Sequence, residues 1–227
     1  MKRIAKIGFL LLGWIFFSVN LLLGQTHETG AVLEGEYNQS IASSWSFVGV
    51  GEMRFANNFT SFDRFKLSCG INYKFLRNRL KTGVTFDYLS KNKLEYFENR
   101  YRVNLNINYT EEIRQWKLAY RARFQSTFYD EKRGTFRFNP KIYMRNRVQV
   151  EYALFSKPVK IFLSEEFFWR LYHPEKKIID EVRTIIGVNY RIDKKNSIDI
   201  FLRMDNEVQV KDPRNVYYLG ICYSFKN

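Results

Sequence analysis

The feature that most constrains this chain is a strict alternation of apolar and polar residues along many of its segments. Across residues 101–109, one face of an extended strand carries apolar side chains, namely Tyr101, Val103, Leu105, Ile107 and Tyr109. Charged and amide residues occupy the positions between them. A helix would scatter these residues around its circumference, whereas a strand separates them onto two faces. The alternation therefore predicts β-structure.

The same alternation recurs in ten segments. The predicted strands cover residues 44–55, 64–75, 80–89, 97–109, 116–128, 144–154, 159–172, 182–192, 197–206 and 215–226. Most are about 10–15 residues long, whereas soluble sheets usually have strands of five or six residues and about 9–11 tilted residues cross a bilayer. Residues 30–37 are interpreted as a short N-terminal strand or an inner-rim segment outside this count.

The connections also alternate in length along the chain. Short ones are predicted at 77–79, 110–115, 156–158 and 193–196, and longer charged ones at 129–141, 173–180 and 206–215. Short periplasmic turns and longer extracellular loops are typical of outer-membrane barrels, whose strand number is even in bacterial single-chain examples. The sequence therefore predicts a closed antiparallel transmembrane β-barrel. Ten strands are preferred and twelve are the alternative.

The polar face of the predicted strands is crowded with charges. Lipid tolerates no unpaired strand edge, so a barrel with its apolar face outward must close and hold its charges inside. A soluble ligand-binding barrel with the apolar face inward is the competing interpretation. We expect a charge ladder in the lumen, formed by Arg100, Arg102, Arg121, Arg123, Arg145, Arg147, Glu98, Glu151 and Glu166.

The N-terminus has the order of a secretory signal. Lys2, Arg3 and Lys6 precede an apolar stretch that ends at the small residue Gly24, which predicts a signal peptide over residues 1–24. A membrane anchor is the alternative, but the run of roughly 18 residues is marginal for a spanning helix. Residues 25–43 then form an N-terminal segment with a short strand, and residues 44–226 form the barrel.

The chain is basic, with a formal net charge of +14. Such a balance usually suggests nucleic acid or an anionic surface. An exported chain rarely meets nucleic acid, so we expect outer-membrane lipid and glycolipid as partners instead. The two cysteines, Cys69 and Cys222, fall on opposite faces of their predicted strands, which is incompatible with a disulfide.

The last predicted strand resembles the β-signal that the barrel assembly machinery of the outer membrane reads. Its polar residue, glycine and two aromatic residues correspond to Tyr218, Gly220, Tyr223 and Phe225, although Lys226 and Asn227 follow the final aromatic residue. The mature chain also resembles the outer-membrane barrel family called domain of unknown function 2490. The resemblance is carried by residues 45–54, 98–101, 120–124, 145–147, 165–168 and 183–191. It implies a barrel and supplies no catalytic residues.

No catalytic constellation is visible in the sequence. The mature histidines, His27 and His173, have no serine two residues further on, as lipases of this membrane require. Glu165 and Glu166 are adjacent on a strand and therefore face opposite sides. Metal sites need clustered ligands, and the few histidines and cysteines of this sequence lie far apart. We therefore expect neither enzymatic activity nor a bound metal or cofactor. The expected function is structural or binding, with a lumen filled by ion pairs. A narrow anion-selective channel or transporter is the alternative.

Overall fold

The computed structural model of the protein describes residues 26–93, 95–130, 140–155, 157–172, 179–209 and 213–227. The signal peptide expected at residues 1–24 lies outside this range. The described part contains eleven β-strands. They are β1 (Thr26–Ser40), β2 (Trp45–Ala56), β3 (Ser61–Phe75), β4 (Leu80–Asn92), β5 (Phe97–Ile113), β6 (Trp116–Tyr129), β7 (Lys141–Ala153), β8 (Val159–Arg170), β9 (Ile179–Arg191), β10 (Asn196–Glu207) and β11 (Arg214–Lys226).

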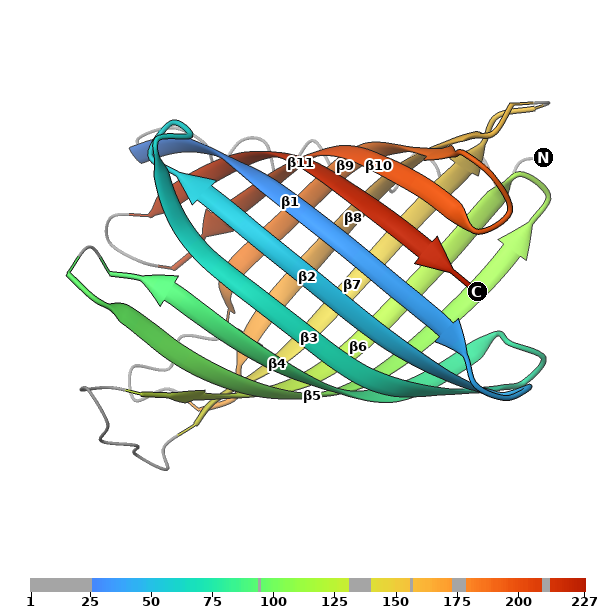
Figure 1. The fold of residues 1–227 in the computed structure, drawn as a ribbon, viewed down its shortest axis with the longest axis horizontal. Coiled ribbons are helices and arrows are strands. Elements are labelled where there is room, and N and C mark those ends of the chain that lie inside the picture. Colours follow the sequence, from blue (N-terminus) through green and yellow to red (C-terminus); the bar gives the residue numbers. More distant parts are fainter. Residues whose placement is uncertain (1–25, 94, 131–139, 156, 173–178, 210–212) are drawn as a thin grey trace.

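The strands form one closed barrel in which each pairs with its sequence neighbours (Figure 1). Neighbours are antiparallel except at the closure, where β1 pairs with β11 in parallel along residues 26–38 and 214–226. The expected closed all-β barrel is confirmed. The preferred count of ten strands, with twelve as the alternative, is wrong, and so is the short segment outside the count. β1 has 15 residues and completes the wall. An odd number of strands closes only through a parallel pair, which the assumption of an even barrel excluded.

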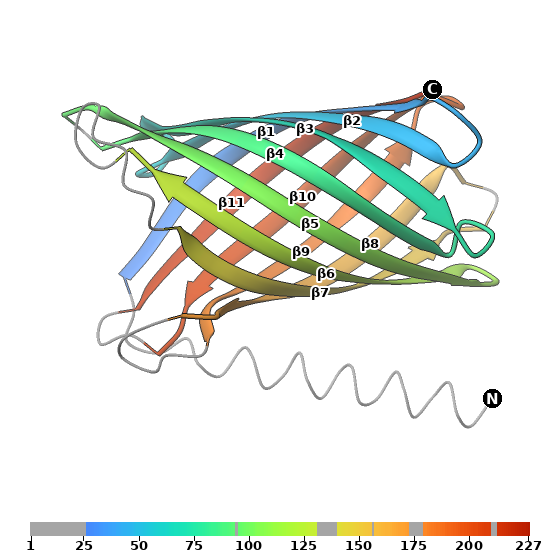
Figure 2. The same cartoon turned by 90° about the horizontal axis from the view of Figure 1, so that it is seen from below.

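The register fixes the inclination of the strands. Followed once around the barrel, the paired residues lead from Thr26 to Ser40 on the same strand, which is a shear of 14 residues. For eleven strands this implies a tilt of about 40°, within the usual range for barrels. The inclination is visible from two directions in Figures 1 and 2. Residues at equal height therefore shift by about 1.3 positions from one strand to the next.

The two faces of the wall follow the alternation in the sequence. On β5 the apolar Leu105 points outward and is 50% exposed, whereas its neighbour Asn104 points inward and is 0% exposed. The apolar face therefore points away from the lumen. The soluble interpretation required this face to enclose an aromatic cavity. Cys69 is exposed on the outside and Cys222 is buried on the inside, and both are free. The predicted placement of the two cysteines on opposite faces of the wall is confirmed.

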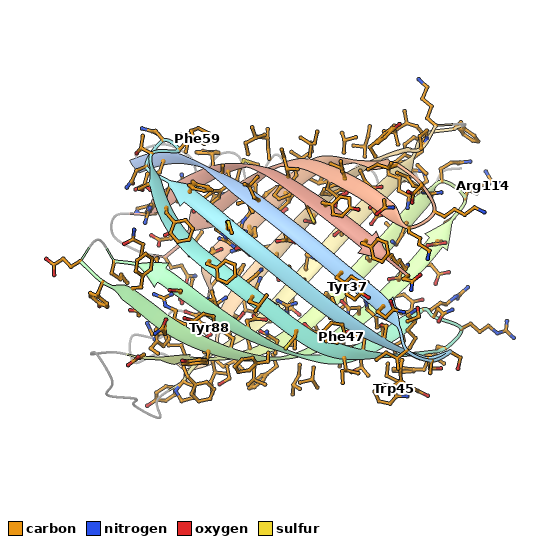
Figure 3. The ribbon with its side chains drawn as sticks, viewed as in Figure 1. Tyr37, Trp45, Phe47, Phe59, Tyr88 and Arg114 are labelled. Carbon is orange, nitrogen blue, oxygen red and sulfur yellow. The ribbon has the colours of Figure 1, made fainter. Side chains whose placement is uncertain are left out.

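The two ends of the barrel differ in their connections. One end, here called the turn end, carries the connections 41–44, 76–79, 114–115, 154–158 and 192–195. The opposite end, here called the loop end, is where the chain leads from β2 to β3, from β4 to β5, from β6 to β7, from β8 to β9 and from β10 to β11. Figure 3 places Trp45 and Tyr37 on the outside toward the turn end and Tyr88 toward the loop end. No helix in the described part of the chain is long and apolar enough to cross a membrane.

Candidate functional site

The candidate site is the lumen of the barrel, which contains a cavity of about 1020 Å³. Its lining extends from Lys194 and Lys195 in a connection at the turn end to Lys91 and Arg214 near the loop end. Twenty of the lining residues are Lys or Arg and thirteen are Asp or Glu. The cavity therefore carries an excess of positive charge along most of the barrel.

Four arginines on β6 and β7 form a compact group of like charges in this wall. The register places Arg121 opposite Arg147 and Arg123 opposite Arg145, and all four point into the lumen. We call these four residues the arginine quartet. Like charges directly opposite one another on neighbouring strands are destabilising unless something neutralises them. The quartet therefore requires negative charge nearby.

A single carboxylate, Glu166 on β8, provides most of that charge. Its side chain accepts hydrogen bonds from Arg121 at 2.6 Å and from Arg145 at 2.8 and 3.2 Å. Arg183 on β9 lies 3.8 Å from the same carboxylate. Glu166 is only 3% exposed, so these charge-assisted contacts are shielded from bulk water and stronger than at a surface.

The other two arginines of the quartet have no carboxylate partner. Arg123 donates a hydrogen bond to the amide oxygen of Asn106 at 2.6 Å. Arg147 makes no hydrogen bond or ion pair with any residue that the structure describes. The quartet with Glu166 therefore retains an excess of positive charge that faces the cavity.

Arg102 on β5 is similarly placed. It points into the lumen opposite Asp87 on β4, but Asp87 accepts a hydrogen bond from Asn104 at 2.9 Å and makes no ion pair with a described residue. The Nε atom of Arg102 is buried without a hydrogen-bond partner in the described part of the chain. Buried polar groups are normally satisfied, so Arg102 is a candidate anion contact.

Two carboxylates of the predicted ladder lie away from the quartet. Glu98 pairs with Arg100 on its own strand, and it is not among the residues that line the cavity. Glu151 pairs with Lys117 at 3.5 Å and Lys160 at 3.8 Å, near the turn end. The ladder is therefore not one continuous network, and Glu166 is the carboxylate that the structure brings to the quartet.

A second charge cluster on the far side of β9 was not among the predicted residues. Asp205 on β10 pairs with Arg183 at 2.7 Å and Arg203 at 2.5 Å, while Glu52 on β2 pairs with Arg54 and, at 2.7 Å, with Lys66. Arg54 also approaches Asp205 to 3.9 Å. The signal was present in the sequence, because Asp205 follows Arg203 by two positions on the same polar face.

The wall opposite the quartet has a different character. In the ring of eleven strands β1 lies across the lumen from β6 and β7. The wall can be followed from Arg123 by moving from each residue to its paired residue on the next strand. This path reaches β1 at Ser40 in one direction and at Thr26 in the other. The point of β1 level with Arg123 lies between these two, near the inward-facing Val32 and Glu34. Apolar and acidic side chains therefore face the guanidinium groups across the cavity.

The predicted assembly-signal residues divide between the two faces. Tyr218 is 4% exposed in the lumen, where Arg54 and Arg203 lie over its ring at 5.7 and 5.5 Å. Tyr223 and Phe225 belong to the outer face, and Phe225 stacks on Tyr37 of β1 with ring centres 5.7 Å apart.

Gly220 leaves room for an aromatic ring in the lumen. A Cβ atom added at this position would lie 2.2 Å from the ring of Phe201 on β10. Phe201 packs against the apolar cluster of Val32, Val216 and Tyr218, which joins β1 to β11 on the inside. The glycine of the predicted signal therefore lets the closing strands pack closely.

The structure describes only some of the residues that were considered for catalysis or metal binding. His173 lies outside the described residues, and His27 belongs to β1. Glu165 and Glu166 occupy opposite faces of β8, as expected for adjacent strand residues. Among the residues that the structure describes, no three His, Cys, Asp or Glu side chains are grouped so that they could hold a metal ion.

Comparison with known proteins identifies one family and one related fold. The family model described as "Protein of unknown function (DUF2490)" matches residues 31–216. No curated protein matches the chain. Among solved structures, that of the NanC porin in a rhombohedral crystal form is similar, with a TM-score of 0.52 over 88% of this chain and 99% of that chain. The sequence identity is 11%, so the likeness concerns the fold alone.

Proposed function

The chain belongs to the family of proteins of unknown function called DUF2490, and from this premise we propose that it is an outer-membrane β-barrel whose lumen conducts small anions. The observation that carries the proposal is the arginine quartet. Four guanidinium groups face one cavity with a single close carboxylate, Glu166, between them. Rings and clusters of arginine select anions in pores.

The outer surface supports a location in the membrane. Large apolar and aromatic side chains are exposed on nearly every strand, for example Leu67 at 54%, Ile107 at 53% and Ile200 at 56%. A soluble protein rarely exposes so large a continuous apolar surface. The likeness to a porin barrel agrees with this location, which in a Gram-negative cell is the outer membrane.

The lumen supports a path for anions. The cavity is lined from the turn end to the loop end, and Arg102, Arg123 and Arg147 have no carboxylate partner among the described residues. Unpaired guanidinium groups offer planar, bidentate contacts to carboxylate or phosphate groups. Conduction requires that an anion bind such groups strongly enough to enter the lumen and weakly enough to leave it, and several successive sites meet this requirement better than one.

The alternative is a structural barrel whose lumen is filled by ion pairs. The networks around Glu166 and Asp205 favour it, because each joins several arginines to one carboxylate. Such a barrel would present its loops to a partner and carry no current.

One experiment separates these functions. The protein is purified from the membrane fraction, where a compact band before boiling is expected, and its single-channel current is recorded in a planar bilayer under a KCl gradient. We expect a current whose reversal potential is shifted toward the equilibrium potential of chloride. Arg147→Gln should lower the ratio of chloride to potassium permeability roughly two- to threefold, because it removes an unpaired lumen charge. The matched control is Arg79→Gln, since Arg79 lies outside the lumen and is 60% exposed beside Glu111.

Three results would contradict the proposal. Recovery of the protein in a soluble fraction would exclude the membrane location. An intact barrel without current would favour the structural alternative. If Arg147→Gln and Arg79→Gln changed the ratio of chloride to potassium permeability equally, the arginine quartet would not determine the selectivity.

A further inference from the structure

One outward-facing residue differs from all others on the middle of the barrel wall. Between the two rims, Glu165 is the only charged side chain at the outward-facing positions of the described strands. It lies near the middle of β8, between Leu163 and Phe167. Its partners in the register are the outward-facing Val148 on β7 and Thr184 on β9. An ionisable residue at this depth of a membrane is costly and usually has a specific partner.

Within the described part of the chain Glu165 has no such partner. It makes no hydrogen bond or ion pair with a described residue, and the same holds for Thr184. Asn146, on the neighbouring strand β7, accepts a hydrogen bond from the hydroxyl of Tyr120 at 2.7 Å through its Oδ1 atom. Its Nδ2 atom donates to no described residue. An unsatisfied acceptor and an unsatisfied donor therefore lie on adjacent strands.

The tilt of the strands brings these two groups to the same height. The registered partner of Asn146 on β8 is Phe167, and Glu165 lies two positions from Phe167 toward the turn end. Because equal height shifts by about 1.3 positions per strand in that direction, Asn146 and Glu165 differ in depth by only about 2 Å. Their side chains point outward side by side.

This arrangement is complementary to itself. Two copies of a membrane protein share one orientation, so a two-fold axis that relates them runs along the membrane normal. When that axis passes between β7 and β8, Asn146 of each copy faces Glu165 of the other at the same depth. Each Nδ2 group can then donate to the carboxyl group of the opposite copy, and both unsatisfied groups are paired.

We propose that the outer face around Asn146 and Glu165 is the contact surface for a second copy of this chain. The inference rests on the membrane location proposed above and does not require anion conduction. The contact is small and polar at its centre, and it is surrounded by the apolar side chains of Val148, Leu163 and Phe167. Interhelical polar contacts in bilayers show that such groups contribute modestly but specifically to association.

The test measures association of the full chain in phospholipid vesicles by energy transfer between differently labelled copies. We expect the native protein to dimerise, with Glu165→Leu and Asn146→Leu each weakening association about tenfold. Both variants place leucine on an apolar surface, so the compact band before boiling should remain. Glu165→Gln keeps an acceptor and should retain most of the association.

The matched control is Cys69→Leu, which alters an exposed residue on β3, on another side of the barrel. It should associate like the native protein. A membrane-embedded protein that stays monomeric at every ratio of protein to lipid would overturn the dimer while leaving the proposed function intact. Association of Glu165→Leu equal to that of the native protein would overturn the assigned surface. A soluble protein would instead remove the membrane location on which both proposals rest.

Discussion

At the scale of single residues, the lumen depends on which carboxylate meets which arginine. Glu166 contacts Arg121, Arg145 and Arg183, so one negative charge is shared among three positive ones. Arg145 and Arg183 also lie over the ring of Phe168 at 4.1 and 4.6 Å, which holds their guanidinium groups in place. Removal of the carboxylate would leave Arg121 and Arg145 close together without their carboxylate partner, while Arg183 would keep its ion pair with Asp205.

Glu166→Gln should therefore lower the free energy of unfolding by about 2–4 kcal/mol, since breaking a buried ion pair leaves an uncompensated charge. The measurement is denaturant unfolding in detergent, followed by the shift between compact and unfolded gel bands. Glu98→Gln is the control, because Glu98 pairs with Arg100 alone. If the lumen is wet enough to screen the quartet, both variants will have equal stability, which would contradict the prediction.

At the scale of elements, strand packing inside the barrel depends on glycines beside aromatic rings. Phe201 lies opposite Gly187 on β9 and Gly220 on β11, and a Cβ atom at either glycine would approach within 2.7 Å of Phe201. The outward-facing Gly51 on β2 differs, since nothing lies within 4 Å of an added Cβ. The same residue type thus has a packing role in one strand and none in another.

Gly220→Ala should destabilise the barrel by about 1–3 kcal/mol, because the added methyl group overlaps the Phe201 ring. Gly51→Ala should be nearly neutral and serves as the control. Refolding yield and the midpoint of denaturant unfolding report both effects. Replacement of Phe201 by leucine in the Gly220→Ala background should recover part of the loss. A Gly220→Ala variant as stable as Gly51→Ala would show that the ring moves aside freely.

At the scale of the whole molecule, the parallel pairing of β1 and β11 decides how the barrel closes. It joins the two ends of the described chain through an inner cluster of Val32, Val216 and Tyr218. On the outside, Tyr37 stacks on Phe225 across the same seam. With eleven strands, β1 and β11 both run from the loop end to the turn end.

A designed disulfide tests this closure. In a background with Cys69→Ser and Cys222→Ser, the changes Ala31→Cys and Leu219→Cys introduce thiols at a registered pair of β1 and β11. Paired strand residues meet the distance that a disulfide needs, so most of the folded protein should become bridged, as non-reducing gels would show. The control pair, Ala31→Cys with Ile200→Cys, joins β1 to β10 and should stay reduced. A ten-strand barrel without β1 would leave both pairs reduced.

The local pattern of residues is enough to assign the strands and the side to which their residues point. Alternation is a local property of an extended chain, so Leu105 and Asn104 could be assigned to opposite faces without knowledge of any neighbour. The ends of β5, β6 and β11 were placed within a few residues for the same reason. β1 was underestimated because an even number of spanning strands left no place in the wall for an eleventh.

The pairings between charged side chains, in contrast, follow from the three-dimensional arrangement of the strands. Glu151 and Glu166 both lie on the polar face in the sequence, yet the register places Glu166 opposite Arg147 and Glu151 beside two lysines. The parallel closure and the equal depth of Asn146 and Glu165 likewise follow from the shear of the barrel. Register and shear arise from hydrogen bonds between segments that are distant in sequence, and these are recorded in no single strand's pattern.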